Sequence, residues 1–202
     1  MDERNFYAFK EKNFFQRFFG HIGTIITHKR NVRRACFKMG IYYQGIFHDM
    51  SKFSPVEFIP SVHYYSGTFS PNASARVITG VSTSWLHHKG KNKHHFEYWT
   101  DYSSKEPYII GCRMPLRYVA EMVADRYAAC VAYNGSNYSQ SDAWIYYERG
   151  AKHLVINDDT RAVLEAALIK MRDEGEEAAF EYMKGLLKIT RGRDYDASIV
   201  NR

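Results

Sequence analysis

The sequence predicts an all-α protein with a single domain. Apolar residues recur at intervals of three and four over most of the chain, which is the period of amphipathic helices. Neither a sustained strand alternation nor an internal repeat is visible in the sequence. With 202 residues, 45% of them hydrophobic and 25% charged, the chain can bury a substantial core. We expect residues 1–12 to be an N-terminal extension, residues 13–190 the helical domain and residues 191–202 a polar C-terminal tail.

Three helices are predicted in the first third of the chain. The first covers residues 13–39, because its apolar side chains follow the helical period and a glycine comes next. Gly20 and Gly23 could divide this stretch into two helices. The second helix covers residues 41–49. A third begins near Pro55, since proline is favoured at the first position of a helix.

The middle of the chain contains the clearest helix. Residues 67–75 are rich in Gly, Ser, Pro and Asn and predict a loop. Residues 76–88 predict a helix that runs into the sequence HHKGKNKHH, where Gly90 and Asn92 could interrupt it. The clearest helix covers residues 114–133, where a proline lies in the opening turn and apolar residues supply a buried face. Asp125 lies near its middle.

The last third of the chain predicts a loop followed by three helices. The loop covers residues 134–141, and the helices cover residues 142–153, 159–172 and 174–189. The residues beyond them are polar, and we expect this tail to fray.

The formal net charge of +6 indicates an anionic partner. A nucleotide, another phosphoester or a nucleic acid would satisfy this charge. The excess is concentrated in two runs beside histidines, residues 29–38 and 89–93. A solvated helix face or loop is the alternative interpretation of each run. No recognition helix or zinc-finger spacing is visible, so a small anionic substrate is favoured over duplex DNA.

Cysteine usage and hydropathy indicate a soluble cytoplasmic protein. The three cysteines are odd in number and lack a CxxC pairing, so neither a disulfide framework nor a cysteine zinc site is expected. The first residues lack the pattern of a signal peptide. No segment reaches the roughly 20 apolar residues needed to cross a bilayer. We therefore expect no membrane partner, and the sequence does not predict an oligomeric state.

The adjacent pair His48 and Asp49 is the most informative feature for function. Imidazole and carboxylate groups are natural ligands of divalent iron, manganese, cobalt and zinc, and a carboxylate can bridge two ions. One pair cannot hold a metal, but His28 precedes it and Asp125 follows on an apolar helix, where an unpaired carboxylate is costly to bury. The alternatives are an ion pair between Asp125 and Arg126 or a solvent-facing Asp125, and an exposed position for His28.

A histidine cluster lies between these candidates. His87, His88, His94 and His95 are four of the nine histidines of the chain and fall within nine residues. A helix through Asn92 would place His88 and His95 on one face, and His87 and His94 have the same spacing. The sequence leaves open which member of each adjacent pair points inward. We expect two ligands from this cluster.

These motifs resemble known proteins. The order His28, His48-Asp49, Asp125 resembles the H…HD…D signature of HD-domain metal-dependent phosphohydrolases, an all-helical superfamily. The string HDMSK is similar to the HDxxK form of HD-GYP phosphodiesterases and of di-iron oxygenases in that superfamily. The strings THKRNV, HDMSKFSPVEF and HHKGKNKHHFEYW resemble more closely an uncharacterised family of bacterial and phage proteins related to HD domains. This resemblance covers roughly residues 20–130.

The resemblance implies an HD-like helical bundle with one or two divalent metal ions. The ion would be Mn, Fe, Co, Ni, Zn or Mg. The ligands of a first ion would be His28, His48, Asp49 and Asp125. Asp49 would bridge to a second ion, for which the implied ligands are His88 and His95 or their neighbours His87 and His94.

The resemblance also implies an activity. We expect hydrolysis of a nucleotide or other small phosphoester by a metal-activated water, with Asp49, Lys52 and Glu121 as catalytic candidates. The alternative for Glu121 is a salt bridge with Arg117. The candidate substrate-binding residues are Lys52, Arg30, Lys91 and Trp99. The sequence lacks the GYP string, so a cyclic dinucleotide is not indicated. The alternative functions are a di-iron oxygenase and a non-catalytic nucleotide-sensing or regulatory module.

Overall fold

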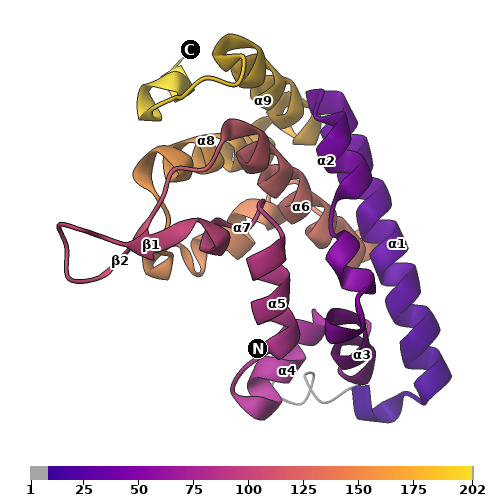
Figure 1. Ribbon diagram of the computed structural model, residues 1–202. Helices are drawn as coiled ribbons and strands as arrows, with labels where there is room; N and C mark the ends of the chain where they lie inside the picture. Colours follow the sequence, from indigo (N-terminus) through magenta and orange to yellow (C-terminus); the bar gives the residue numbers. More distant parts are fainter. Residues whose placement is uncertain (1–8, 202) are drawn as a thin grey trace.

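Helix α1 (Phe14–Met39) runs the length of the molecule (Figure 1). The computed structural model describes residues 9–201. Within this range the α-helices are α1, α2 (Tyr42–Phe47), α3 (Pro55–His63), α4 (Pro71–Thr79), α5 (Thr83–Lys91), α6 (Leu116–Asn134), α7 (Asp142–Glu148), α8 (Asp158–Glu174) and α9 (Glu176–Thr190). The 3₁₀ helices include η2 (Met50–Phe53), η3 (Phe96–Trp99), η4 (Gly135–Asn137), η5 (Ala151–His153) and η6 (Ala197–Asn201). The prediction of an all-α domain is confirmed.

Local sequence signals account for the two ends of α1. Asn13 and Gln16 form a capping box in which each side chain accepts a hydrogen bond from the other residue's backbone N–H, both at 2.9 Å. Gly40 ends the helix in the left-handed conformation, with φ of 81°. Gly20 and Gly23 lie within the helix and do not divide it.

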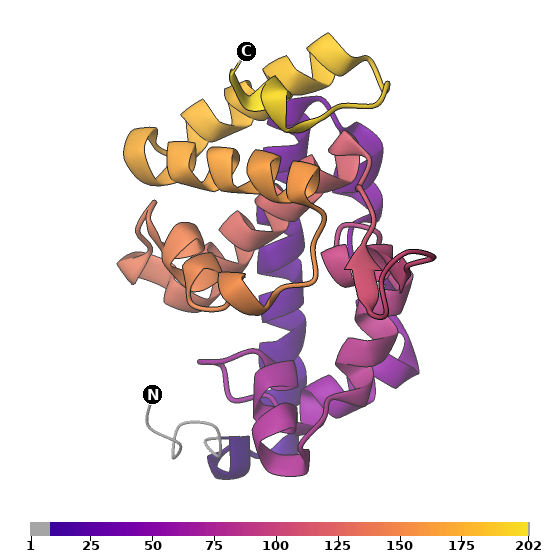
Figure 2. The ribbon, with the colours of Figure 1, turned by 90° about the vertical axis from the view of Figure 1, so that its left-hand side faces the viewer.

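The core lies where α6 and α9 pack against α1 and where α8 packs against α6 and α9. Figure 2 shows α8 and α9 crossing the upper end of α1, while α3, α4 and α5 lie at its lower end. Val32 of α1, Val123 of α6, Leu168 of α8 and Met183 of α9 are fully buried. Truncating such a leucine to alanine typically costs about 2–5 kcal/mol. This core fixes α1 and α6 against each other.

Two predicted helices end earlier than expected. The helix predicted for residues 41–49 ends at Phe47, so His48 and Asp49 lie in the connection to η2. The helix predicted for residues 142–153 ends at Glu148 and is followed by η5.

The region from residue 67 to residue 95 also differs from the prediction. Two helices replace the single helix predicted for residues 76–88, because Gly80 ends α4 with φ of 78° and Ser82 caps α5. Helix α4 begins at Pro71, inside the predicted loop. Helix α5 ends at Lys91, and Asn92 has an extended conformation. The helical spacing expected for His88, Asn92 and His95 is therefore wrong.

A small antiparallel hairpin was not predicted. Strand β1 (Thr100–Tyr102) pairs with β2 (Ile109–Gly111), with Thr100 opposite Gly111. The hairpin projects from the helical body (Figure 1). Its strands have three residues each, which is too short for a clear alternation in the sequence.

The structure describes only part of the expected N-terminal extension, but it describes most of the C-terminal segment. Residues 1–8 of the expected N-terminal extension lie outside the described residues, and Phe9 packs on the rings of His63 and Tyr64. The C-terminal segment does not fray as expected. Tyr195 and Ile199 are buried, and the Tyr195 hydroxyl donates to the Met114 carbonyl at 2.7 Å.

Candidate metal centre

Asp49 occupies a strained turn at the centre of a cluster of imidazole and carboxylate groups. Its backbone is left-handed, with φ of 54° and ψ of 32°. Outside glycine this conformation is uncommon, although aspartate tolerates it better than most residues, and it is often found at functional sites. The turn follows α2 directly and precedes η2. It directs a fully buried carboxylate toward His28 of α1 and His88 of α5, within 4.8 Å of the Asp125 carboxylate of α6.

A first group of four ligands surrounds one oxygen of Asp49. The Nε2 atom of His28 lies 3.0 Å from Asp125 Oδ1, 3.3 Å from His48 Nε2 and 3.7 Å from Asp49 Oδ2. His48 Nε2 lies 3.1 Å from Asp49 Oδ2 and 3.3 Å from Asp125 Oδ1. Nitrogen and oxygen ligands at about 2.0–2.2 Å from one ion are roughly 3–3.5 Å apart. Four of the five distances fall in this range, and the ligand atoms of all four residues lie within 4.8 Å of one another, so the group matches the spacing of a metal site.

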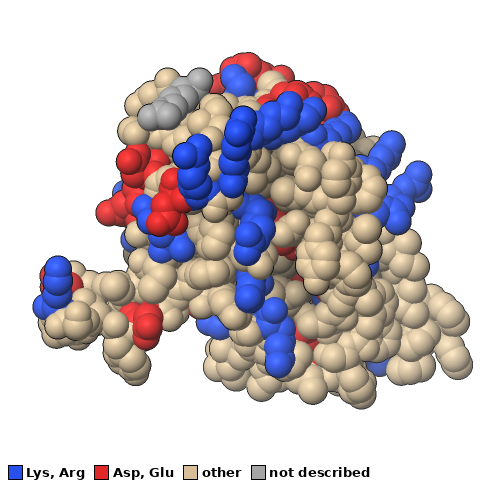
Figure 3. All heavy atoms as spheres, turned by 45° about the horizontal axis from the view of Figure 1, so that its top comes forward, with Lys and Arg blue, Asp and Glu red and all other residues tan. Residues whose placement is uncertain are grey.

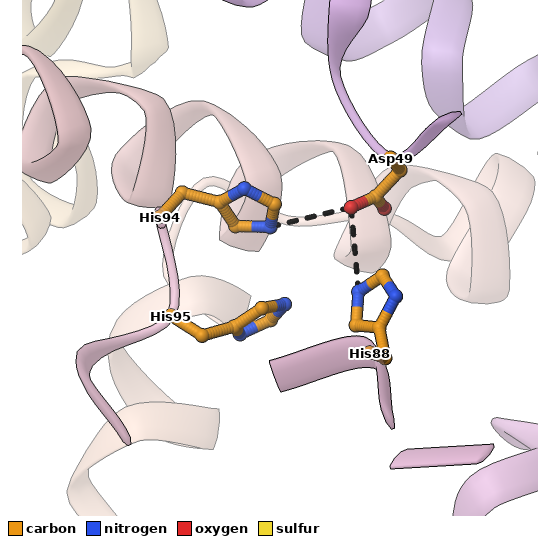
Figure 4. A group of neighbouring side chains, drawn as sticks. All are labelled: Asp49, His88, His94 and His95. Carbon is orange, nitrogen blue, oxygen red and sulfur yellow. Dashed lines mark ion pairs between the residues drawn. The ribbon is translucent and has the colours of Figure 1, made fainter. Parts of the chain in front are cut away.

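A second group surrounds the other oxygen of Asp49. Figure 4 shows the rings of His88, His94 and His95 turned toward Asp49. Asp49 Oδ1 lies 3.3 Å from His88 Nε2 and 3.4 Å from His94 Nε2. The ligand atoms of these four residues lie within 4.8 Å of one another. Because each group uses a different oxygen of Asp49, this carboxylate can bridge two ions.

Two buried glutamates orient the imidazole rings. Glu121 Oε1 accepts hydrogen bonds from the Nδ1 atoms of His48 and His94, at 2.9 Å and 3.1 Å. Glu57 accepts from Nδ1 of His88 and of His87, both at 2.7 Å. An ionised carboxylate only accepts hydrogen bonds, so each Nδ1 carries the proton. The opposite Nε2 atoms of His48, His88 and His94 face Asp49 and are placed to ligate a metal ion, as in carboxylate–histidine–metal arrangements.

His48, His94 and Glu121 also form a group whose ligand atoms lie within 4.8 Å of one another. We assign their contacts to hydrogen bonds, because 2.9 Å and 3.1 Å are ordinary N–H···O distances.

The electrostatics of the cluster favour a cation. Burial opposes charge on His48, yet Asp49, Asp125 and Glu121 outweigh it and raise the pKa of His48 well above its ordinary value. Burial would raise the pKa of Asp49, but His48, Lys52 and His88 hold it well below its ordinary range. Burial and the neighbouring His94 and His88 hold the pKa of His95 well below its ordinary value. The His95 ring is therefore neutral, and one of its nitrogens has a lone pair that can bind a metal ion.

Hydrogen bonding leaves several ligand atoms unsatisfied. The Oδ2 atom of Asp49 has the Lys52 ammonium 2.5 Å away, but Oδ1 is buried without a hydrogen-bond partner among the described residues. The same holds for Nε2 of His94 and of His95. A buried polar atom without a partner costs about 1–3 kcal/mol. A divalent ion would satisfy these three atoms, so the residues present fit a metal.

The structure shows which of the alternative ligands lie in the cluster. His88, His94 and His95 all reach the cluster, three histidines where two were expected, whereas His87 binds Glu57 outside it. Asp125 contacts His28 and His48, and the Arg126 guanidinium lies instead over the Tyr147 ring, 5.4 Å from its centroid.

The expected catalytic residues Lys52 and Glu121 lie at the cluster, but three of the expected substrate-binding residues do not. Lys52 Nζ lies 2.5 Å from Asp49 Oδ2. Glu121 binds His48 and His94 and has no such contact with Arg117, whose guanidinium lies over the Tyr118 ring. Arg30 and Lys91 are exposed, and the Trp99 indole donates to the Lys93 carbonyl at 2.7 Å. The structure does not bring Arg30, Lys91 or Trp99 to the cluster.

Sequence reasoning missed three supporting contacts. Glu57 lies two residues after Pro55 in α3, and its carboxylate accepts from His88 Nδ1 at 2.7 Å. The Lys29 ammonium donates to the His48 carbonyl. The Asn92 amide donates to Ser51 Oγ at 2.7 Å and to the His88 carbonyl at 2.8 Å, which ties the end of α5 to η2. The adjacency of Lys29 to His28 was the one available signal.

Comparison with known proteins places the chain in a family. A family model described as a family of unknown function, DUF5662, matches residues 17–170, and no HD-domain family model matches. No curated protein and no solved structure matches the chain. Among the described residues, no helix combines the length and apolarity needed to cross a membrane. The matched region includes every residue of the cluster and most of the core, and the chain therefore belongs to the family of unknown function DUF5662.

Proposed function

We propose that this chain is a metal-dependent phosphohydrolase that acts on a nucleotide or another small phosphoester. The observation that carries the proposal is the shared carboxylate of Asp49, which faces one ligand group with each oxygen and has Lys52 beside it. The H…HD…D order of these ligands and its resemblance to HD-domain phosphohydrolases support the reaction class. Bound there, divalent ions supply Lewis acidity, which lowers the pKa of water and neutralises charge on phosphoryl oxygens.

The exposure of the residues around the cluster supports one side for substrate approach. Asp49 and His48 have no exposed side-chain surface, whereas 18% of the Asp125 side chain and 27% of the Lys52 side chain are exposed. A phosphoryl group would reach the cluster on this side. Two cavities of about 230 Å³ lie elsewhere, so neither is proposed as the substrate site.

Lys52 supplies a positive donor at that opening. Burial lowers the pKa of its ammonium, but Asp49 and Asp125 outweigh this effect and raise the pKa above its ordinary value. Lys52 therefore stays charged at neutral pH and can donate from Nζ to a phosphoryl oxygen. During hydrolysis the water oxygen forms a new bond to phosphorus, the ester P–O bond breaks, and the leaving oxygen takes up a proton. Lys52 stabilises the negative charge that develops on the phosphoryl oxygens during this step.

Glu121 and Glu57 position the histidines. Burial would raise the pKa of Glu121, but hydrogen bonds from His48 and His94 lower it below its ordinary value. Glu121 stays ionised and keeps the protons on Nδ1 of both rings. Glu57 does the same for His88, with hydrogen bonds from His88 and His87 holding its pKa low against the effect of burial.

Metal analysis and a substrate panel test the proposal. Protein purified without chelators is analysed for bound metal and then assayed on phosphoesters with Mn, Co, Ni and Mg. We expect bound metal, release of phosphate or of a phosphorylated product, loss of activity with EDTA and its return with metal. The variant His153→Gln changes an exposed histidine outside the cluster and should keep both the bound metal and the activity, so it serves as the control. Iron with an oxygen-dependent product and no hydrolysis would indicate an oxygenase, and tight nucleotide binding without turnover would indicate a sensing module.

A further inference from the structure

One face of the molecule exposes an unusual number of large apolar side chains. We define the apolar face by eight residues, each between 47% and 68% exposed: Phe14, Phe15, Phe19 and Ile26 of α1, Met50 and Phe53 of η2, and Val56 and Ile59 of α3. Singly exposed apolar residues are common, but a large contiguous patch marks an interaction site.

Contacts between the elements make this face continuous. Helices α1 and α3 lie side by side, and a groove of about 230 Å³ between them is lined by residues that include Phe14, Phe18, Phe58 and Ile59. Lys29 Nζ of α1 lies 3.5 Å from Met50 Sδ, which joins η2 to the same surface. Phe15, Phe19 and Ile26 share one side of α1 by their helical spacing.

The chemistry of the face is that of an interface core. Figure 3 shows few Lys, Arg, Asp or Glu side chains over the lower right of the molecule, where α1 and α3 lie in Figure 1. Among the residues that line the groove, Arg17 alone carries a permanent charge, and its guanidinium donates to the His63 carbonyl at 3.3 Å. Aromatic residues are enriched and charged residues depleted in the cores of protein interfaces, and homodimer interfaces are the more apolar ones.

The exposed area matches what a stable dimer buries. Apolar side chains of this size present roughly 150–200 Å² each when fully exposed, so eight of them at about half to two-thirds exposure offer on the order of 800 Å². Each partner of a standard stable interface contributes about 800 Å². A surface without opposing charges is also complementary to itself across a two-fold axis.

We propose that the apolar face is the interface of a symmetric homodimer. Two copies related by a two-fold axis pack their α1 and α3 helices against each other. This inference does not depend on the proposed hydrolase activity, because it rests on the surface and leaves the metal cluster in place.

The charges around the face predict how salt affects the dimer. Arg30 and Arg33 are exposed on α1 beyond Ile26, and the whole chain carries a net charge of +6. Two copies bring like charges together, so screening by salt strengthens association. A nucleic acid or an anionic lipid surface on the same face would show the opposite dependence, because salt weakens such binding.

Sedimentation velocity on the full chain tests the proposal. We expect a dimer that dissociates on dilution within about 1–100 µM and associates more tightly as salt is raised. Phe19→Asp should weaken association about 30-fold or more, because it buries a charge in the interface. Phe15→Asp is a second variant with the same expectation. Tyr102→Asp, at an exposed tyrosine of the hairpin, is the matched control and should leave the dimer intact.

Three results would overturn the homodimer. The first is a wild-type protein that stays monomeric over the whole concentration range. The second is a dimer that both phenylalanine variants leave unchanged while circular dichroism shows native helix content. The third is a monomer that binds anionic vesicles at low salt through Phe19, which would assign the face to a lipid surface.

Discussion

His28 on α1 meets Asp125 on α6, with the Nε2 and Oδ1 atoms 3.0 Å apart. The two helices form the most extensive packing pair of the described residues. The contact joins the first and last ligands along the chain and closes the first ligand group around Asp49. The stable core between α1 and α6 therefore sets the geometry of the candidate metal centre.

Asp49→Asn should remove bound metal and activity together. The substitution keeps the shape of the side chain and the tolerance for the left-handed conformation, but it removes the charge that both ligand groups share. Helix content should stay native. Metal content by mass spectrometry and far-ultraviolet circular dichroism measure the two effects. Stoichiometric metal in this variant would contradict the proposed bridging role.

Glu121→Gln should weaken metal binding about 10–100-fold without abolishing it. The amide no longer accepts the Nδ1 protons of His48 and His94 as strongly, so the rings lose their orientation toward Asp49. Metal titration measures the affinity. Glu181→Gln, at an exposed glutamate of α9, is the matched control. Equal affinities in the two variants would show that Glu121 does not position the rings.

Lys52→Met should lower kcat about 10²–10³-fold while metal stays bound, because it removes a positive donor at the phosphoryl oxygens. The methionine replaces the apolar part of the side chain. Steady-state kinetics and metal analysis on the same sample separate the two roles. An unchanged kcat would exclude Lys52 from charge stabilisation, and loss of metal would make it a structural partner of Asp49.

His21→Leu should reduce the loss of stability in acid. His21 is buried against the rings of Phe58 and Tyr65, and burial, with a contribution from Lys52, lowers the pKa of His21 to about 4. In the unfolded chain His21 takes up a proton near pH 6.5. In the folded protein His21 takes up a proton only near pH 4. The free energy of unfolding therefore falls as pH drops from 6.5 to 4, by roughly 3 kcal/mol from this residue.

Urea unfolding at several pH values measures this difference. The wild-type protein and His153→Gln should lose stability in parallel as the pH falls, and His21→Leu should lose less. His153 is exposed, so it serves as the control for a change of histidine number. The same loss of stability per pH unit in all three proteins would show that folding does not lower the pKa of His21.

Two glycines of α1 should respond oppositely to alanine. At Gly23 an added Cβ has no atom within 4 Å, so Gly23→Ala should stabilise the helix by about 1 kcal/mol. At Gly20 the Cβ would lie 2.5 Å from Cε1 of Tyr65, whose hydroxyl lies 2.9 Å from Thr24 Oγ1. Gly20→Ala should therefore destabilise by about 1–3 kcal/mol. Thermal unfolding at equal protein concentration compares the two, and two equal shifts would rule out the steric contact.

The local order of residues was sufficient to predict the fold class and most of the ligand inventory. Helical periodicity and caps act within a few residues, so the ranges of α1, α6, α8 and α9 could be read directly. The adjacency of His48 and Asp49, and a carboxylate at position 125 on an apolar helix, are also local facts. They identified candidate ligands before any contact was known.

Only the tertiary structure decided how these residues meet. The early end of α5 brings both His94 and His95 to Asp49, and that end depends on the bonds of Asn92 to Ser51 and to the His88 carbonyl. The left-handed turn at Asp49 and the hydrogen bonds that Glu57 and Glu121 accept join segments far apart in the chain. Their geometry depends on how α1, α5 and α6 pack around the core, because no local pattern encodes the distance between residues on different helices.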